Sequence, residues 1–372
     1  MGSALLLSVL GIVVINTVHR PGEANYALRQ IVFLCAGLVA CAIVMVPHYR
    51  WLQRISWPLM FVVLGLLVFV LIPWVPEQIV RPRNGSRRWI NLVVTDFQPS
   101  ELAKVAYILV LATYLRYRSN YRNLFGLLWV LGLTFIPLGL VLKEPDLGTS
   151  LLFLPTLFAM LIAAGAKMKH IVLIVVLGLS AAPLMYPLLE KHQKDRIDAM
   201  IAQIKGDDRY SDGIGYQADR AMTLAGAGGF FGAGKDKAAD LVTYNHLPED
   251  HNDMVFAVVC CRWGFVGAIV TWVLFGVFCL GGLLTAALAK DPFARLVAVG
   301  IVAALFAQMT INTGMNIGLL PITGMTLPFV SYGGSSMVTA WMMVGLLLSI
   351  AMRRSKYMSR HSFEFDEVAA EE

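Results

Sequence analysis

Uncharged, apolar runs of about 18 to 22 residues recur along the whole chain, and they restrict what it can fold into. A run of this length crosses the hydrocarbon core of a bilayer as one α-helix. Because that core offers no water to the backbone, each run must form its hydrogen bonds internally. Of the 372 residues, 58% are hydrophobic and only 15% are charged, which excludes an ordinary soluble domain. The sequence therefore predicts an all-α, polytopic membrane helix bundle.

The runs predict about ten spans in a single transmembrane domain over residues 1–361. The first run, Ala4 to Val18, lacks the basic leader and the small-residue cleavage site of a signal peptide, so we expect it to be the first span. A long polar loop at about 190–253 separates spans seven and eight, and a short acidic tail follows at 362–372. The predicted spans are 4–18, 28–47, 55–74, 100–117, 124–142, 149–165, 170–188, 254–288, 295–320 and 336–352.

Lys and Arg are concentrated in alternate short loops, and this asymmetry orients the predicted bundle. The positive-inside rule makes these loops cytoplasmic, so both termini are expected inside and the loop at 190–253 outside. The formal charge of +6 does not indicate nucleic acid, because the basic residues lie at helix ends and in loops. Anionic lipid is the expected partner of these side chains. They are Arg50, Arg54, Arg116, Arg118, Arg122, Lys167, Lys169, Lys290, Arg295, Arg353, Arg354, Lys356 and Arg360.

One predicted outside loop, between spans three and four, is also rich in arginine. These side chains are either ordinary solvated surface or the ligands of an anion bound at the outer face. They are Arg81, Arg83, Arg87 and Arg88.

The start of span four carries a buried cation. Ser100 and Glu101 are typical of a helix start, and Lys104 is spaced to pair with Glu101. Cap and pair alone would be a structural explanation. However, Lys104 lies a turn inside a span and must face protein or water, which makes it a candidate ligand for pyrophosphate.

Two aspartates precede spans on the outer side. Asp146 either caps span six or orients Lys104 or an arginine in a shared polar cavity. Asp253 stands directly before the apolar run of span eight, where an ionisable group is costly and marks a functional site.

The acidic and histidine-rich segment around Asp253 fits no zinc pattern. It comprises His246, Glu249, Asp250, His251 and Asp253. A weakly bound, hydrated divalent ion (Mg or Mn) that bridges Asp253 and a substrate phosphate is the more reasonable metal hypothesis. The five cysteines lie in apolar runs without metal-like spacing and are expected to be small core residues.

The glycines before Lys235 imitate a phosphate-binding loop, but Asp236 stands where a Ser or Thr should bind magnesium. We therefore expect no nucleotide site. Close backbone approach explains Gly228 to Gly234 better, with Lys235 meeting lipid phosphate.

A segment rich in Gly and Pro runs from Asn312 to Ser336 at the outer ends of spans nine and ten. Such backbone beside a membrane must be buried in protein or line a cavity. It is either a re-entrant plug without a ligand or a binding wall, in which Ser331 and Ser335 offer hydroxyls to a sugar or phosphate.

These blocks, in this order and over nearly the whole chain, resemble the SEDS family, the shape, elongation, division and sporulation proteins. The similarity rests on Arg88–Leu92 with Phe97–Lys104, Glu144–Thr149, Leu247–Asp253, and Gly318 through Ser335. Gln98–Glu101, Pro145–Thr149 and Asn312–Met315 look more like its elongation branch, RodA, than its division branch, FtsW.

The resemblance implies a peptidoglycan glycosyltransferase that polymerises lipid II at the outer face of the bacterial cytoplasmic membrane. It implies a class B penicillin-binding protein and elongation-complex membrane proteins as partners. The family's essential aspartate falls on Asp253, its buried Glu and Lys on Glu101 and Lys104, and the aspartate of its Pro-Asp-Leu-Gly block on Asp146.

Our mechanistic hypothesis assigns Asp253 as the general base for an acceptor hydroxyl. Arg88, Lys104 and Arg83 neutralise the leaving pyrophosphate, while Glu101 and Asp146 hold Lys104 and the helix ends in place. The rival from another class is a lipid II flippase, and a purely structural scaffold is a third reading that leaves these charges without a task.

Overall fold

The computed structural model describes residues 1–18, 25–83, 86–92, 96–118, 123–188, 194–195, 197–199, 201–202 and 214–353. The acidic tail expected at 362–372, and residues 190–193, 196, 200 and 203–213 of the loop expected at 190–253, lie outside the described residues.

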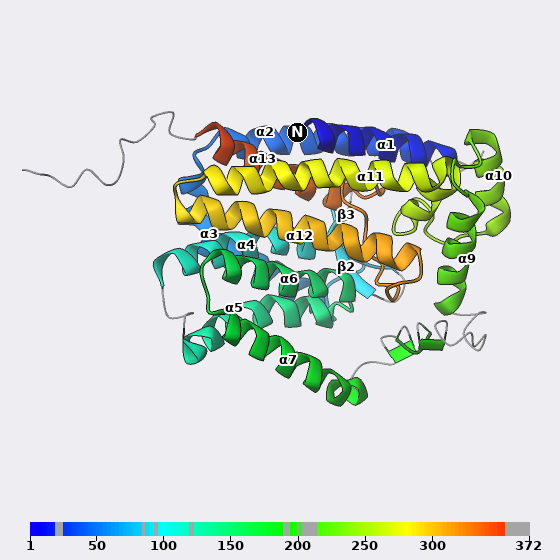
Figure 1. The fold of residues 1–372 in the computed structure, drawn as a ribbon. Helices are drawn as coiled ribbons and strands as arrows, with labels where there is room; N and C mark the ends of the chain where they lie inside the picture. The colour runs from blue at the N-terminus through cyan, green and yellow to red at the C-terminus, as the bar shows by residue number, and fades with distance from the viewer. Residues whose placement is uncertain are drawn as a thin grey trace, which may run out of the picture.

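Long helices lie side by side and form most of the molecule, in the order of the predicted spans (Figure 1). Six described helices, α2, α3, α5, α11, α12 and α13, are long and apolar enough to cross a membrane, and α1, α6 and the first part of α7 are shorter apolar helices. The multi-pass helical architecture is therefore confirmed, whereas the count of ten crossings stays a prediction. The helices are α1 Gly2–Val18, α2 Tyr26–Met45, α3 Tyr49–Leu71, α4 Pro99–Tyr117, α5 Leu124–Lys143, α6 Leu147–Ala163, α7 Met168–Met185, the short η2 Tyr186–Leu188, α9 Ile214–Ala227, α10 Lys235–Asn245, α11 Val255–Leu288, α12 Pro292–Asn316 and α13 Gly334–Met352.

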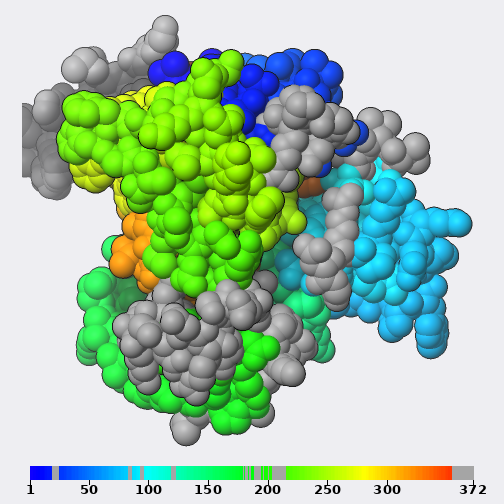
Figure 2. Space-filling model, turned by 90° about the vertical axis from the view of Figure 1, so that its right-hand side faces the viewer, coloured from blue at the N-terminus to red at the C-terminus, as the bar shows by residue number. Residues whose placement is uncertain are grey.

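Helix α12 is central to the bundle, since it packs against α4, α6, α9, α11 and α13. Helix α2 pairs with α13, and α3 pairs with α4. At one end, α9 and α10 stand across the end of α11 (Figure 1). Figure 2 looks onto this end and shows the yellow-green α9–α10 segment and the cyan strand region on different sides of it.

A small antiparallel sheet corrects the prediction of an all-α fold. Strands β1 (Val80–Arg83), β2 (Ser86–Asn91) and β3 (Asp96–Phe97) pair in the order β1-β2-β3. The sequence did not reveal them because they are short and rich in arginine, and such strands are marginal alone. Contacts of β2 with α3 and α4 support them here.

Two helix boundaries differ from the predicted spans by four residues or more. Helix α3 begins at Tyr49, since the His48 ring accepts a hydrogen bond from the Arg50 N–H at 3.2 Å and caps the helix. The prediction started near residue 55 because it excluded charged residues, which a helix tolerates beyond the membrane core. Helix α12 ends at Asn316 rather than near 320, and Gly318 follows with φ 75°, a left-handed conformation that stops helices.

Helix α11 is broken at Gly264, where φ is 64° and ψ is −157°. The glycine-rich loop between α9 and α10 supplies hydrogen-bond partners where the helix is broken. Phe265 and Val266 N–H groups donate to the carbonyls of Gly229 and Phe230, at 2.9 and 3.2 Å. In return, the N–H groups of residues 233 and 234 donate to the carbonyls of residues 261 and 262. These four hydrogen bonds give backbone groups on both sides of the break partners within the protein, which a membrane helix needs where it is interrupted.

This close approach confirms the structural explanation for the glycines. A Cβ on Gly228 would collide with the Cys260 carbonyl, and one on Gly232 would collide with the Arg262 carbonyl. Helix α9, rather than the strand of a phosphate-binding loop, precedes these glycines, and Lys235 begins α10 and is exposed.

We expect Gly228→Ala to lower the free energy of unfolding by about 1–3 kcal/mol, because the methyl group forces two backbones apart. Gly226→Ala is the matched control, since a Cβ at Gly226 meets nothing within 4 Å. Thermal unfolding of the detergent-purified variants measures both. Equal melting temperatures for the two variants would contradict this packing.

Candidate active site

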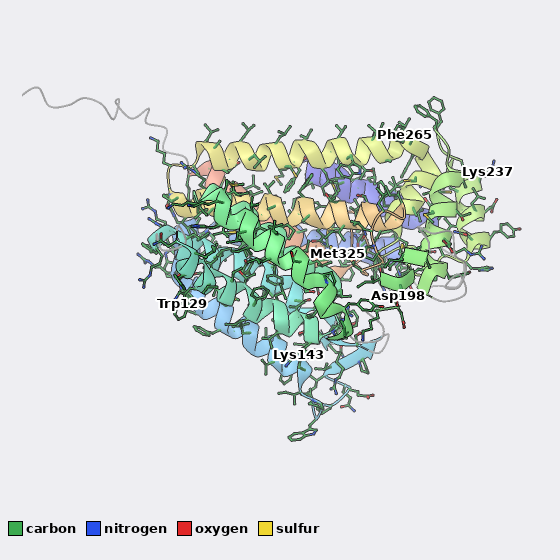
Figure 3. The ribbon with its side chains drawn as sticks, turned by 60° about the horizontal axis from the view of Figure 1, so that its bottom comes forward. Trp129, Lys143, Asp198, Lys237, Phe265 and Met325 are labelled. Carbon is green, nitrogen blue, oxygen red and sulfur yellow. The ribbon has the colours of Figure 1, made fainter. Side chains whose placement is uncertain are left out.

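A cavity of about 790 Å³ lies where the non-helical chain between α12 and α13 meets the sheet and the starts of α4 and α6. The Gly- and Pro-rich segment forms one wall, which confirms the prediction that such backbone lines a cavity or is buried. Met325 of this wall lies deep among the helices in Figure 3. The lining residues are Phe33, Ser86, Arg88, Trp89, Asp96, Gln98, Glu101, Pro145, Asp146, Thr149, Gln217, Glu249, Asn252, Asp253, Ile322, Thr323, Gly324, Met325, Thr326, Tyr332, Gly333, Gly334, Ser335 and Ser336.

Asp253 lines this cavity, and its main chain is clamped by α12. The side-chain amides of Asn312 and Asn316 both donate to the Asp253 carbonyl, at 2.8 and 2.9 Å. A methyl group at residue 324 would lie 3.4 Å from the Asp253 Oδ2 atom, so Gly324 leaves room beside the carboxylate. The backbone of Asp253 is thus fixed from one side while its side chain faces the cavity.

Three buried amides, Gln308, Asn312 and Asn316, lie four residues apart on one face of α12, and we call them the amide stripe. Gln308 donates to the Thr326 carbonyl at 2.9 Å, and Asn312 donates to the Met325 carbonyl at 2.6 Å. The Asn316 Oδ1 atom accepts from the N–H of residue 257 in the first turn of α11, at 3.1 Å. The stripe therefore joins the cavity wall, the Asp253 loop and the start of α11. The role of this stripe was not predicted from the sequence, although three amides at i, i+4 and i+8 in an apolar helix were the available signal.

Arg88 reaches the cavity from β2 and is held mainly by backbone. Its Nε donates to the Glu144 carbonyl at 2.6 Å, and its Nη2 donates to the Pro145 carbonyl and to the Ser86 hydroxyl. Its Nη1 lies 4.0 Å from Asp146 Oδ1. This geometry presents a cation on the cavity wall.

Asp146 both caps α6 and orients polar groups, so both alternatives left open by its sequence are realised. Its Oδ1 accepts from the Thr149 N–H at 3.1 Å. Its Oδ2 accepts from the Gln98 amide at 3.0 Å and from the Ser100 hydroxyl at 3.3 Å. The oriented cation is Arg88, however, and not Lys104.

Lys104 pairs with Glu101 as its spacing predicts, with Nζ 3.0 Å from each carboxylate oxygen. Nζ also donates to the Gln308 side-chain oxygen at 3.1 Å. Lys104 is only 5% exposed and is absent from the cavity lining, whereas Glu101 lines it. Lys104, the expected pyrophosphate ligand, therefore lies behind the described cavity wall, where it pairs with Glu101.

Two further expected ligands also lie off the cavity wall. Ser331 is buried, and its Oγ accepts from the Leu327 N–H at 2.7 Å, so it stabilises the loop. Lys235 is exposed on α10 and does not line the cavity. Ser335 does line it, while its Oγ bonds to Gln98 N–H and to the Asp96 carbonyl at 3.1 and 3.0 Å. The side chain of Arg83 lies outside the described structure.

The cavity wall is richer in carboxylates than the sequence predicted. Among the described lining residues Arg88 is the one basic side chain, and five acids line the same cavity: Asp96, Glu101, Asp146, Glu249 and Asp253. In the described part of the chain, no three His, Cys, Asp or Glu side chains gather as ready metal ligands. The divalent ion expected at Asp253 therefore stays a prediction.

Glu144, at the end of α5, is a buried acid to which sequence analysis gave no role. It has no exposed surface, and neither carboxylate oxygen has a hydrogen-bond partner within the described residues. Burial raises the pKa of Glu144 to about 9; the nearby Asp146 raises it too, while Arg88 lowers it. Because the neutral Glu144 side chain does not form an ion pair with Arg88, the Arg88 guanidinium is bound by the Glu144 and Pro145 carbonyls and remains available to the cavity.

Comparison with known proteins places this geometry in a family. The family model FTSW_RODA_SPOVE, described as "Cell cycle protein", matches residues 1–356. The probable peptidoglycan glycosyltransferase FtsW of Pseudomonas fluorescens (strain SBW25) is 35% identical over 382 residues, covering 99% of this chain and 90% of that protein. Stage V sporulation protein E of Bacillus subtilis (strain 168) is 35% identical over 337 residues, covering 89% and 88%.

Two solved structures have the same fold. A chain from "Structural coordination of polymerization and crosslinking by a peptidoglycan synthase complex" superposes with a TM-score of 0.80 at 28% identity, covering 96% of this chain and 97% of that one. The rod shape determining protein RodA of Thermus thermophilus superposes with a TM-score of 0.69 at 27% identity, covering 96% of each chain.

We expect Asn312→Leu to lower the free energy of unfolding by about 1–3 kcal/mol, because the Met325 carbonyl loses this donor and the Asp253 carbonyl keeps only Asn316. The variant should also be less active, because Asp253 is held less firmly. Thr310→Leu is the control. It is in the same helix, and its hydroxyl donates only to the Phe306 carbonyl of that helix. Thermal unfolding and turnover are the measurements. A variant with normal turnover would show that the clamp does not position Asp253.

Stability should depend on pH through Glu144. Its folded-state pKa, about 9, exceeds its usual value of 4.5, so its stabilising contribution is complete below about pH 4.5 and is lost as pH rises through 9. Glu144→Gln removes this titration. The melting temperature of the variant minus that of the wild type should therefore increase from about pH 5 to about pH 9. A constant difference would show that Glu144 is not buried as a neutral acid.

Proposed function

Because the chain belongs to the FTSW_RODA_SPOVE (SEDS) family of cell cycle proteins, we propose that it is a peptidoglycan glycosyltransferase that polymerises lipid II at the outer face of the cytoplasmic membrane. The observation that carries the proposal is one carboxylate, Asp253, clamped through its backbone on the wall of a large polar cavity. The names of the similar FtsW proteins supply the reaction class.

Asp253 acts as the general base in the proposed reaction. A sugar hydroxyl of one substrate attacks the anomeric carbon of another, and its proton passes to the Asp253 carboxylate. The new C–O bond forms as the bond to the lipid pyrophosphate breaks, and the pyrophosphate leaves as an anion. Attack opposite the leaving group inverts the anomeric centre. Because pyrophosphate leaves without protonation, no second carboxylic acid has to serve as a proton donor.

Arg88 neutralises the departing pyrophosphate, since it is the cation that the described cavity wall presents. Lys104 contributes indirectly, because its ion pair cancels the Glu101 charge that would otherwise repel a phosphate. A divalent cation, Mg²⁺ or Mn²⁺, held by Asp253 and the substrate phosphates would supply further positive charge. The carboxylates of the described cavity wall support this proposal, since Mg²⁺ is usually bound by one or two carboxylates together with substrate phosphates.

For the cellular role we propose elongation, on the RodA-like blocks at Gln98–Glu101, Pro145–Thr149 and Asn312–Met315. The relatives at 33–35% identity are named for division and for sporulation, so the role needs its own test. Depletion should give round cells if the role is elongation and filaments if it is division. A class B penicillin-binding protein is the proposed partner, since a structural neighbour comes from a complex that couples polymerization and crosslinking.

Purified protein, with its cognate penicillin-binding protein, should polymerise lipid II, and Asp253→Asn or Asp253→Ala should reduce the rate at least about 100-fold. Asp236→Asn, which removes an exposed carboxylate from the first turn of α10, is the charge-matched control. Glycan length on gels is the readout.

Normal polymerisation by both Asp253 variants would exclude the base assignment. A flippase would move labelled lipid II between the leaflets of a vesicle and make no glycan, so the same preparation distinguishes the rival function.

A further inference from the structure

A second cavity, of about 460 Å³, lies at the opposite end of α4 from the candidate active site. Helix α4 has 19 residues, so about 28 Å separates its ends, close to the thickness of a bilayer core. The active-site cavity contacts the first turn of α4, at Gln98 and Glu101. The second cavity contacts the last turns of α4 and the first turns of α3. Because α3 is long and apolar enough to cross a membrane and packs along α4, we expect the two cavities at opposite membrane faces.

Three arginines line this second cavity, which we call the arginine pocket. Its walls are Arg50, Gln53 and Arg54 of α3 and Thr113, Arg116 and Tyr117 of α4. A volume of about 460 Å³ falls within the range of sites that hold small ligands or headgroups.

Hydrogen bonds hold the pocket open and preorganise it. Arg116 Nη1 donates to Gln53 Oε1 at 2.6 Å, and Gln53 Nε2 donates to the Tyr117 hydroxyl at 2.8 Å. At the pocket floor, the Ser56 and Thr113 hydroxyls lie 3.0 Å apart and share a hydrogen bond. The α3 and α4 walls are thereby fixed relative to each other.

The pocket carries excess positive charge. Asp291, the N-cap of α12, lies 3.3 Å from Arg116 and 3.7 Å from Arg50, so one carboxylate serves two arginines. Within the described residues, Arg54 has no carboxylate within 4.0 Å, and it is exposed. An anion with forked acceptor oxygens would match these guanidinium groups.

Aromatic side chains place the pocket at the level of lipid headgroups. Trp51 and Trp57 of α3 are 62% and 37% exposed, and Tyr117 is 67% exposed. Trp and Tyr at helix ends mark the membrane–water interface. A membrane phosphate is therefore the anion that this pocket meets at high local concentration.

We propose that the arginine pocket binds the phosphate of an anionic phospholipid from the leaflet opposite the active-site cavity. Arg54 and Arg50 contact the phosphate oxygens, and Arg116 stays with Asp291 and Gln53 as part of the wall. The acyl chains lie along the apolar outer surfaces of α3, beside Phe61 and Val62, which are 67% and 60% exposed. This site is independent of the proposed transferase reaction.

Detergent-purified protein titrated with phosphatidylglycerol tests the proposal, with native mass spectrometry for the adduct and thermal unfolding for its effect. Wild type should retain phosphatidylglycerol at least about tenfold better than phosphatidylcholine. Arg54→Gln and the double variant Arg50→Gln/Arg54→Gln should abolish this preference. Because Arg54 makes no ion pair with the described residues, Arg54→Gln should fold and melt as the wild type does without lipid.

The matched control is Lys167→Gln/Lys169→Gln, which removes two exposed charges near the start of α7, at the same end of the bundle and outside the pocket. This control should keep the wild-type preference. An equal loss in both double variants would show nonspecific charge attraction and overturn the proposal. Inorganic phosphate and glycerol phosphate form the soluble arm, and binding as tight as that of the lipid would overturn the lipid assignment. Unchanged lipid preference in the Arg50/Arg54 double variant would overturn the site itself.

Discussion

The amide stripe of α12 is the interaction on which the active-site geometry depends. A membrane helix bundle has no water for unpaired backbone groups, so non-helical chain at membrane depth must find its partners in protein. Gln308, Asn312 and Asn316 provide them for the loop between α12 and α13 and for the turn that carries Asp253. Because these amides satisfy the non-helical backbone, a polar cavity with a non-helical wall can exist inside an apolar bundle.

The break in α11 follows the same rule by another route. At Gly264 the glycine loop after α9 accepts and donates the hydrogen bonds that the helix has lost. Because the two backbones approach so closely, a side chain at residue 228 or 232 would collide with the backbone of α11. These hydrogen bonds and this close approach therefore explain the cluster of glycines, which from the sequence alone could be mistaken for a phosphate-binding loop.

The electrostatics of the cavity differ from a simple basic cradle for pyrophosphate. Arg88 is held by carbonyls of the Glu144–Pro145 turn, and Lys104 forms an ion pair with Glu101 and a hydrogen bond with Gln308. Acids predominate on the described wall, and the pKa of Glu144 just behind it is raised so that it stays neutral. The described wall thus presents one fixed arginine among several carboxylates. Excess arginine appears instead at the other end of α3 and α4, where Asp291 serves two of the three guanidinium groups.

The sequence by itself determined the helical, membrane-spanning class, the order of the helices, the non-helical wall and the Glu101–Lys104 pair, because these follow from apolar run length, from Gly and Pro content and from local spacing. It also singled out Asp253, Arg88 and Asp146, which the structure brings to one cavity. Only the tertiary structure decided that Lys104 and Ser331 lie behind the wall, that β1–β3 form a sheet, and that Asn312 and Asn316 clamp Asp253. The reason is physical: whether a polar side chain faces a cavity or a neighbouring backbone depends on partners up to hundreds of residues away, and local sequence does not encode them.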